Sequence, residues 1–121
     1  MTAEFQNTSI GLRERHLIVH SEILNRSQTS WHSAEGWNTG YHLFDNPSGT
    51  LVIDGVRAPL ELPPAVSHML DTHIALPPEP GDYSVYVSVM REHVAWFYDQ
   101  GWPFILIDVS VAEDGTPTSG V

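Results

Sequence analysis

The stretch Asp82–Arg91, DYSVYVSVMR, decides the fold, because its residues alternate between two chemically different faces. One face consists of Tyr83, Val85, Val87 and Val89, and the other of Ser84, Tyr86, Ser88 and Met90. A period of two residues is typical of a strand that buries one face. The stretch Phe104–Val111, FILIDVSV, alternates in the same way and predicts a buried face of Ile105, Ile107, Val109 and Val111. We expect these two strands to be neighbours in the core.

Other strand patterns precede this pair. His16–Asn25 and Tyr41–Asp45 each mix apolar with polar residues and end at turn-forming residues. Leu51–Ile53 is separated from Val56–Arg57 by Asp54-Gly55, which predicts a hairpin with a type I′ turn.

The segment Val66–Leu76 fits both a helical stripe and a strand. We predict a strand, because Pro63-Pro64 and Pro77-Pro78 keep the element short. No other long helical stripe is present for a lone helix to join.

Six or seven short strands without an alternating helix predict an all-β fold, an immunoglobulin-like antiparallel β-sandwich, with a closed barrel as the alternative. The sandwich is expected over residues 10–112, with a loose segment over 1–9 and a flexible tail over 113–121. Tyr83 follows the corner Pro80-Gly81, as in the tyrosine corner of immunoglobulin-like domains, whose hydroxyl binds upstream backbone.

The composition excludes several partners and cofactors. The chain has 121 residues, a formal charge of −10, five cationic side chains that are all arginine, and no cysteine. It therefore lacks the basic surface that nucleic acids or anionic membranes attract, and it lacks the thiolates of many metal sites and of disulfides. The seven histidines form no metal-binding motif, so we expect no metal and no cofactor. Without a membrane-length apolar run or a secretory signal, we expect no membrane insertion and a cytoplasmic location.

Several short motifs recur in one known family. They are Asp54-Gly55-Val56-Arg57-Ala58-Pro59-Leu60, then Leu62-Pro63-Pro64, Leu76-Pro77-Pro78-Glu79-Pro80-Gly81-Asp82-Tyr83 and Arg91-Glu92-His93-Val94-Ala95-Trp96-Phe97. In this order they resemble the β-sandwich domain fused to the nucleotide-binding subunit of O-antigen ABC exporters. Similar modules accompany bacterial glycosyltransferases and methyltransferases of polysaccharide assembly. The chain differs at His93, where the family usually has glycine, and it contains no nucleotide-binding G-x-x-x-x-G-K-[ST] motif.

The resemblance implies a non-catalytic module that binds an oligosaccharide or polysaccharide during assembly or export of bacterial surface polysaccharide. It also implies a homodimer formed by pairing of edge strands. Arg57 and Glu92 lie within the shared motifs, and we expect them to form a buried structural ion pair, since a guanidinium matches a carboxylate bidentately.

Aromatic residues are the best candidates for a sugar site, because the apolar face of a pyranose stacks on such rings. The residues expected to bind glycan are Trp37, Tyr41, His42, Trp96 and Trp102. The alternative for Trp96 and Phe97 is that they plug one end of the sandwich.

Two other functional classes stay open. An immunoglobulin-like domain can serve as a protein-interaction or dimerisation module with no glycan ligand. A small enzyme using a histidine and a carboxylate is the other class. The sequence contains no nucleophile motif, and the spacing of its carboxylates does not single out an acid/base pair. We therefore expect no catalytic residues.

Overall fold

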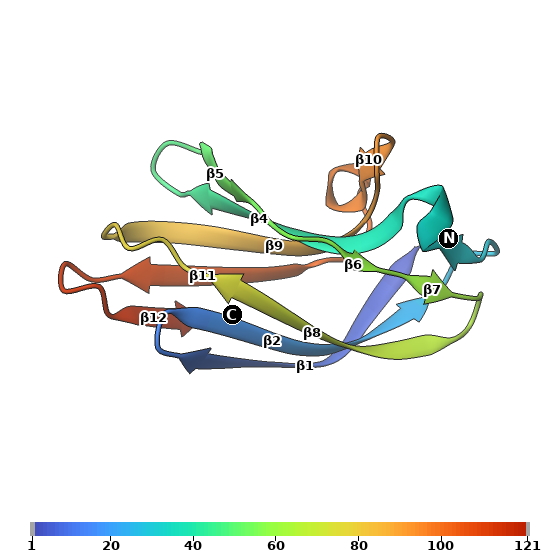
Figure 1. Cartoon of the computed structure of the whole chain (residues 1–121), viewed down its shortest axis with the longest axis horizontal. Coiled ribbons are helices and arrows are strands. Elements are labelled where there is room, and N and C mark those ends of the chain that lie inside the picture. Colours follow the sequence, from blue (N-terminus) through green and yellow to red (C-terminus); the bar gives the residue numbers. More distant parts are fainter. Residues whose placement is uncertain (1, 121) are drawn as a thin grey trace.

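Two antiparallel sheets face each other in the structure, a computed structural model that describes residues 2–120. Figure 1 shows most of the larger sheet in the upper part of the view and the smaller sheet in the lower part, where the last strand of the larger sheet lies beside it. Two short 3-10 turns are the only helical elements within these residues. The predicted all-β, immunoglobulin-like sandwich is confirmed.

Twelve strands make up the two layers and a small two-stranded addition. The smaller sheet has the order β1 (Ala3–Arg13), β2 (His16–Asn25), β8 (Ser67–Ala75). The larger sheet has the order β12 (Pro117–Gly120), β11 (Ile105–Val111), β9 (Gly81–Arg91), β4 (Trp37–Asp45), β5 (Leu51–Asp54). In addition, β10 (Ala95–Trp96) pairs with β9, β6 (Ala58–Pro59) pairs with β4, and β3 (Trp31–His32) pairs with β7 (Glu61–Leu62).

The alternating stretches occupy the centre of the larger sheet, as predicted. β9 and β11 are neighbours, with Val85 opposite Ile107 and Val87 opposite Ile105. All four residues are buried and face the smaller sheet, as do Val109 and Val111. Burial of this aliphatic face removes apolar surface from water and so stabilises the fold.

The tyrosine corner is also present. Tyr83 is buried, and its hydroxyl donates to the carbonyl oxygen of Glu79 at 2.7 Å. This bond fixes the chain where it enters β9.

The predicted hairpin at Asp54-Gly55 is wrong. β5 instead forms its hairpin with β4 across residues 46–50, and the chain then returns as β6 to pair with β4. Gly55 is not among the residues with positive φ. Glycine is required at position 55 for a steric reason, because a Cβ there would overlap the ring of Tyr41.

The ends of the chain differ from the expected boundaries. Residues 3–9, expected to be loose, form part of β1 and pair with β2. Residues 117–120, expected to lie in the tail, pair with β11. β1 is an edge strand with mostly exposed or half-buried residues, so it has no apolar alternation to reveal it.

A tryptophan cluster closes one end of the sandwich. Trp31 and Trp37 stack with ring centroids 5.2 Å apart, and Phe97 and Trp102 stack at 4.2 Å. Trp37 also stacks on Phe97 at 5.3 Å, which joins the two pairs. We call Trp31, Trp37, Phe97 and Trp102 the tryptophan cluster.

Candidate functional site

The outer face of the larger sheet carries mainly polar and aromatic side chains on β4 and β9, whereas the inner face of β9 and β11 is mainly aliphatic. These outward positions on β4 and β9 include His42, Phe44, Ser84, Tyr86 and Ser88, which alternate with buried inward residues. The segment formed by β10 and the turn η2 (Phe97–Gln100) lies over this face (Figure 1).

Two local features fix this segment to the sheet. The buried hydroxyl of Ser88 accepts a hydrogen bond from the backbone N–H of Tyr98 at 3.1 Å. Gly40 leaves room for the ring of Trp96, because a Cβ there would lie 2.8 Å from Cη2 of Trp96. In the turn that precedes the segment, His93 has a φ of 62°, the left-handed conformation that glycine adopts most easily.

Trp96 lies against His42 with ring centroids 3.6 Å apart. The guanidinium carbon of Arg57 lies 4.9 Å from the Trp96 ring centroid, within cation–π range. Trp96 therefore covers His42, whose side chain is only 11% exposed.

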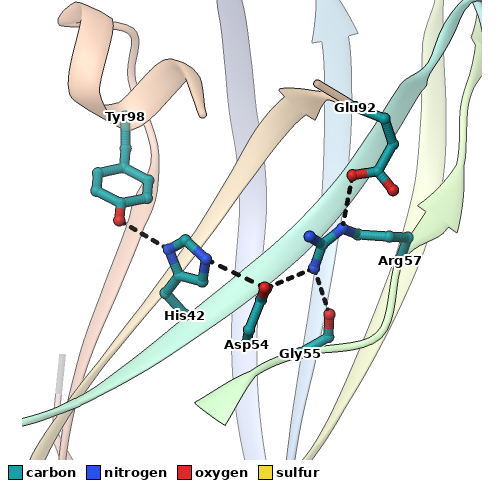
Figure 2. Close-up of polar contacts among 6 residues, drawn as sticks. All are labelled: His42, Asp54, Gly55, Arg57, Glu92 and Tyr98. Atoms are coloured by element: carbon teal, nitrogen blue, oxygen red, sulfur yellow. Dashed lines mark hydrogen bonds and ion pairs between the residues drawn. The ribbon is translucent and has the colours of Figure 1, made fainter. Parts of the chain in front are cut away.

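His42 links a tyrosine to a carboxylate (Figure 2). Its Nδ1 lies 2.8 Å from the Tyr98 hydroxyl, and its Nε2 lies 3.2 Å from Oδ1 of Asp54. Burial lowers the pKa of His42 from its ordinary value of 6.5, although Asp54 acts in the opposite direction. Burial is the larger effect, so the ring is neutral at neutral pH.

Arg57 continues this network on the other side of Asp54 (Figure 2). Its Nη1 donates to Asp54 Oδ1 at 2.7 Å and to the Gly55 carbonyl oxygen at 2.6 Å. The bond from Arg57 lowers the pKa of Asp54, which keeps this carboxylate ionised. Glu92 is a more distant partner, with its Oε1 3.4 Å from Arg57 Nε.

The Arg57–Glu92 contact is therefore weaker than the expected buried, bidentate pair. It is a single contact, and its side chains are 25% and 39% exposed. Asp54, only three residues from Arg57, takes the short bond instead.

Beside this network the outer face is hollowed into a pocket of about 500 Å³. Four aromatic rings, which we call the pocket rings, line it: Phe44, Tyr86, Tyr98 and Phe104. Its other lining residues are Asp45, Asn46, Gly49, Ser84 and Asp99.

The pocket rings support one another. Tyr86 stacks on Phe104 with centroids 5.2 Å apart and planes 6° apart. Phe44 meets the Tyr86 ring at its edge at 5.3 Å, and Tyr98 lies 5.0 Å from it. The result is a fixed aromatic floor with hydrogen-bonding groups at its rim.

The charged side chains that line the pocket are acidic. Asp45 and Asp99 line it, and no arginine does. Burial, followed by the charge of Asp99, raises the pKa of Tyr98 to about 12. The Tyr98 hydroxyl therefore stays protonated and offers hydrogen bonds.

The structure separates the five residues expected to bind glycan. Trp37 is buried in the tryptophan cluster, half-buried Trp102 stacks on Phe97 there, and Tyr41 is buried in the core between the sheets. Only His42 and Trp96 lie together on the outer face, where Trp96 covers the histidine. The plug predicted as an alternative is formed by Phe97 but not by Trp96.

The pocket rings were missed as binding candidates, although the sequence contains a signal for two of them. Tyr86 belongs to the polar face of the Asp82–Arg91 alternation. Phe104 precedes Ile105 in the sequence and therefore points to the face opposite the predicted buried face of Phe104–Val111. An aromatic ring on the polar face of a strand points away from the core, where it can contact a ligand.

No group of three or more histidine or acidic side chains among residues 2–120 is placed to hold a metal ion. Over the same residues, no helix has the length and apolar character needed to cross a membrane.

No protein-family model matches the chain, and no curated protein matches its sequence. Among solved structures, the chain is similar to β-glucosidase 3B from Thermotoga neapolitana in complex with glucose. The TM-score is 0.53 and the identity 14%, over 98% of this chain but only 16% of the β-glucosidase chain. A structure of the same enzyme with α-D-glucose gives a TM-score of 0.50 with the same identity and coverage. This likeness establishes a shared β-sandwich fold.

Proposed function

We propose that the protein is a non-catalytic carbohydrate-binding module, and that neutral or amino sugars bind in the pocket formed by the pocket rings. The observation that supports this most is the pocket itself, about 500 Å³ on the outer face of the larger sheet, with four aromatic rings and a polar rim. Its volume is within the range of small-molecule sites.

The chemistry of the lining matches a sugar. The stacked faces of Tyr86 and Phe104 suit the C–H face of a pyranose, and Asn46, Ser84 and Tyr98 can bind its hydroxyls. Asp45 and Asp99 accept hydrogen bonds from hydroxyl or ammonium groups and repel carboxylates. Neutral and amino sugars are therefore favoured over uronic acids or phosphorylated sugars.

The state of the Tyr98 hydroxyl gives no support to a tyrosine nucleophile in the pocket. Its pKa of about 12 makes Tyr98 a poor nucleophile at neutral pH. Tyr98 therefore suits recognition better than bond cleavage.

The biological setting of the proposal comes from the motifs of Asp54–Leu60, Leu76–Tyr83 and Arg91–Phe97. Their resemblance to polysaccharide-exporter domains supports a role beside the bacterial machinery that assembles or exports surface polysaccharide, on the cytoplasmic side. The β-glucosidase likeness adds support for the fold only.

The test is calorimetric titration with three tetrasaccharides of N-acetylglucosamine, glucosamine and galacturonate. We expect the first two to bind with a Kd between roughly micromolar and millimolar, and the acidic one not to bind. Tyr86→Ala should abolish binding, whereas Met69→Ala, at an exposed position on the other sheet, should leave it unchanged. Binding of the galacturonate probe alone, or equal binding by Tyr86→Ala, would contradict the proposal.

The interaction module is the second candidate, favoured by the edge strand β5. Leu51 and Val52 on β5 are 43% and 46% exposed, and Val56 follows with 77%. Pairing of β5 with β5 of a second copy would cover this apolar edge. Sedimentation equilibrium of wild type and Val52→Lys tests it: a dimer that the variant dissociates supports this candidate, and a monomer at all concentrations contradicts it.

A further inference from the structure

We infer that Asp54 and His42 act as positioning residues that set the hydrogen-bonding direction of the Tyr98 hydroxyl, so that it presents an acceptor to the ligand. This inference rests on the proposed function of the same pocket. The three residues form a continuous chain from Asp54 through His42 to Tyr98 (Figure 2).

The first step fixes the proton on His42. Oδ1 of Asp54 lies 3.2 Å from Nε2 of His42, and the carboxylate can only accept. Arg57 holds Asp54 ionised through the 2.7 Å bond from Nη1. The proton of a neutral His42 ring therefore sits on Nε2.

The second step fixes the hydroxyl. With Nε2 protonated, Nδ1 of His42 has a lone pair and can only accept. The Tyr98 hydroxyl, 2.8 Å away, must donate its proton to Nδ1. The in-plane lone pair of the oxygen then remains as an acceptor for partners in the pocket, which Tyr98 lines.

As a consequence, the pocket favours ligands that present hydrogen-bond donors. The Tyr98 oxygen adds an acceptor to those of Asp45 and Asp99. A sugar hydroxyl or an amide N–H satisfies such a rim, whereas a ring oxygen or a carboxylate does not.

Protonation of His42 reverses the direction of the hydrogen bond between Tyr98 and Nδ1. With protons on both ring nitrogens, Nδ1 donates to the Tyr98 oxygen, and the hydroxyl proton must turn away towards the pocket. The charged groups facing His42 are Asp54 and Asp99, which favour protonation, and Arg57, which with burial opposes it. Glu92 acts only through its contact with Arg57.

The opposite sheet supplies a matched control. His20 and Asp71 form a second histidine–aspartate couple, with Nδ1 and Oδ1 2.5 Å apart. Their side chains are 50% and 57% exposed, and neither lines the pocket. Changes at His20 should therefore leave the Tyr98 hydroxyl unaffected.

The first arm of the test needs no ligand. The ¹⁵N chemical shifts of the His42 ring, recorded by NMR at about pH 8, should show a protonated Nε2 and an unprotonated Nδ1. The opposite tautomer would overturn the inference. The same shifts, followed to lower pH, identify the pH at which His42 becomes protonated.

The second arm measures the affinity for the neutral N-acetylglucosamine tetrasaccharide from about pH 8 to well below that pH, where His42 is fully protonated. We expect wild-type affinity to fall roughly fivefold, which corresponds to the loss of one neutral hydrogen bond. His42→Phe, which keeps a ring against Trp96, should lose this pH step, and so should Tyr98→Phe, whereas His20→Phe should retain it. A flat wild-type profile, or an unchanged step in Tyr98→Phe, would overturn the inference. If no probe binds, the proposed function fails, and the tautomer measurement still decides whether Asp54 and His42 direct the hydroxyl.

Discussion

The tryptophan cluster and the pocket rings are both groups of four aromatic residues, yet they lie in different surroundings. Trp31, the most buried member of the first group, is fully inaccessible to solvent and packs between the sheets with Ile23 and Leu62. Tyr86, a member of the second, stands on the outer face of β9 and borders an open pocket. One group closes the end of the core, and the other is available to a ligand.

The difference follows from the direction in which each side chain leaves its strand. Trp37 lies on the inward face of β4, whereas His42 and Phe44 lie on its outward face, as their odd spacing from Trp37 requires. Ring size and proximity to a turn say little about function here. The face of the strand decides whether a ring stabilises the fold or recognises a ligand.

The largest expected effect separates the two groups by stability. Trp31→Ala removes a fully buried ring that stacks on Trp37, and it should lower the free energy of unfolding by about 3–5 kcal/mol. Phe44→Ala should lower it far less, because Phe44 borders the open pocket. Chemical denaturation measures both, and equal losses would contradict the distinction.

The next effect concerns the packing of Trp96 on the outer face. Gly40→Ala places a Cβ 2.8 Å from the Trp96 ring and 3.3 Å from Cδ of Arg57. We expect a loss of about 1–3 kcal/mol, as for other overpacked sites, and loss of the Trp96–His42 ring contact. Gly11→Ala is the control, since its Cβ would meet nothing within 4 Å. Equal stability of the two variants in urea would show that Trp96 does not need the room that Gly40 leaves.

A smaller effect is expected at an aromatic residue that belongs to neither group. Tyr83→Phe keeps the buried ring and removes the bond to the Glu79 carbonyl oxygen. The expected loss is about 1 kcal/mol, the net value of one hydrogen bond. Denaturation curves that coincide with wild type would mean that the corner bond does not contribute.

The smallest effect is the pH dependence that His42 gives to stability. Its pKa is lowered on folding, so between that value and 6.5 the unfolded chain binds more protons than the folded one. Stability from this source is complete above pH 6.5 and falls as the pH drops towards the folded-state pKa. His42→Phe should lack this slope, as measured by thermal unfolding at a series of pH values. A steeper decline in the variant would mean that the sign is wrong.

The strands could be predicted where apolar and polar residues alternate along the chain. Asp82–Arg91, Phe104–Val111, His16–Asn25 and the ambiguous Val66–Leu76 were all predicted as strands, and the structure confirms each. β1 escaped prediction because an exposed edge strand has no need of apolar alternation. The prediction of a hairpin turn at Asp54-Gly55 was wrong, because Gly55 makes room for the ring of Tyr41 and does not adopt a positive φ.

The site was less predictable than the fold. His42 and Trp96 were named, but their contact depends on the pairing of β10 with β9 and on the space at Gly40. Tyr98 lies 56 residues from His42 in the chain, and no local pattern connects them. Nonlocal contacts of this kind come from the topology, which a single sequence does not encode in any short motif.

The most direct test of the division between the two aromatic groups is a two-dimensional ¹H–¹⁵N NMR titration with the N-acetylglucosamine tetrasaccharide. The account predicts that the backbone signals of Asn46, Ser84, Tyr86 and Asp99 shift with added sugar, because these residues line the pocket. The indole signals of Trp31 and Trp37, both buried at the end of the sandwich, should stay in place. Shifts concentrated on those indoles, with the pocket signals unmoved, would contradict it.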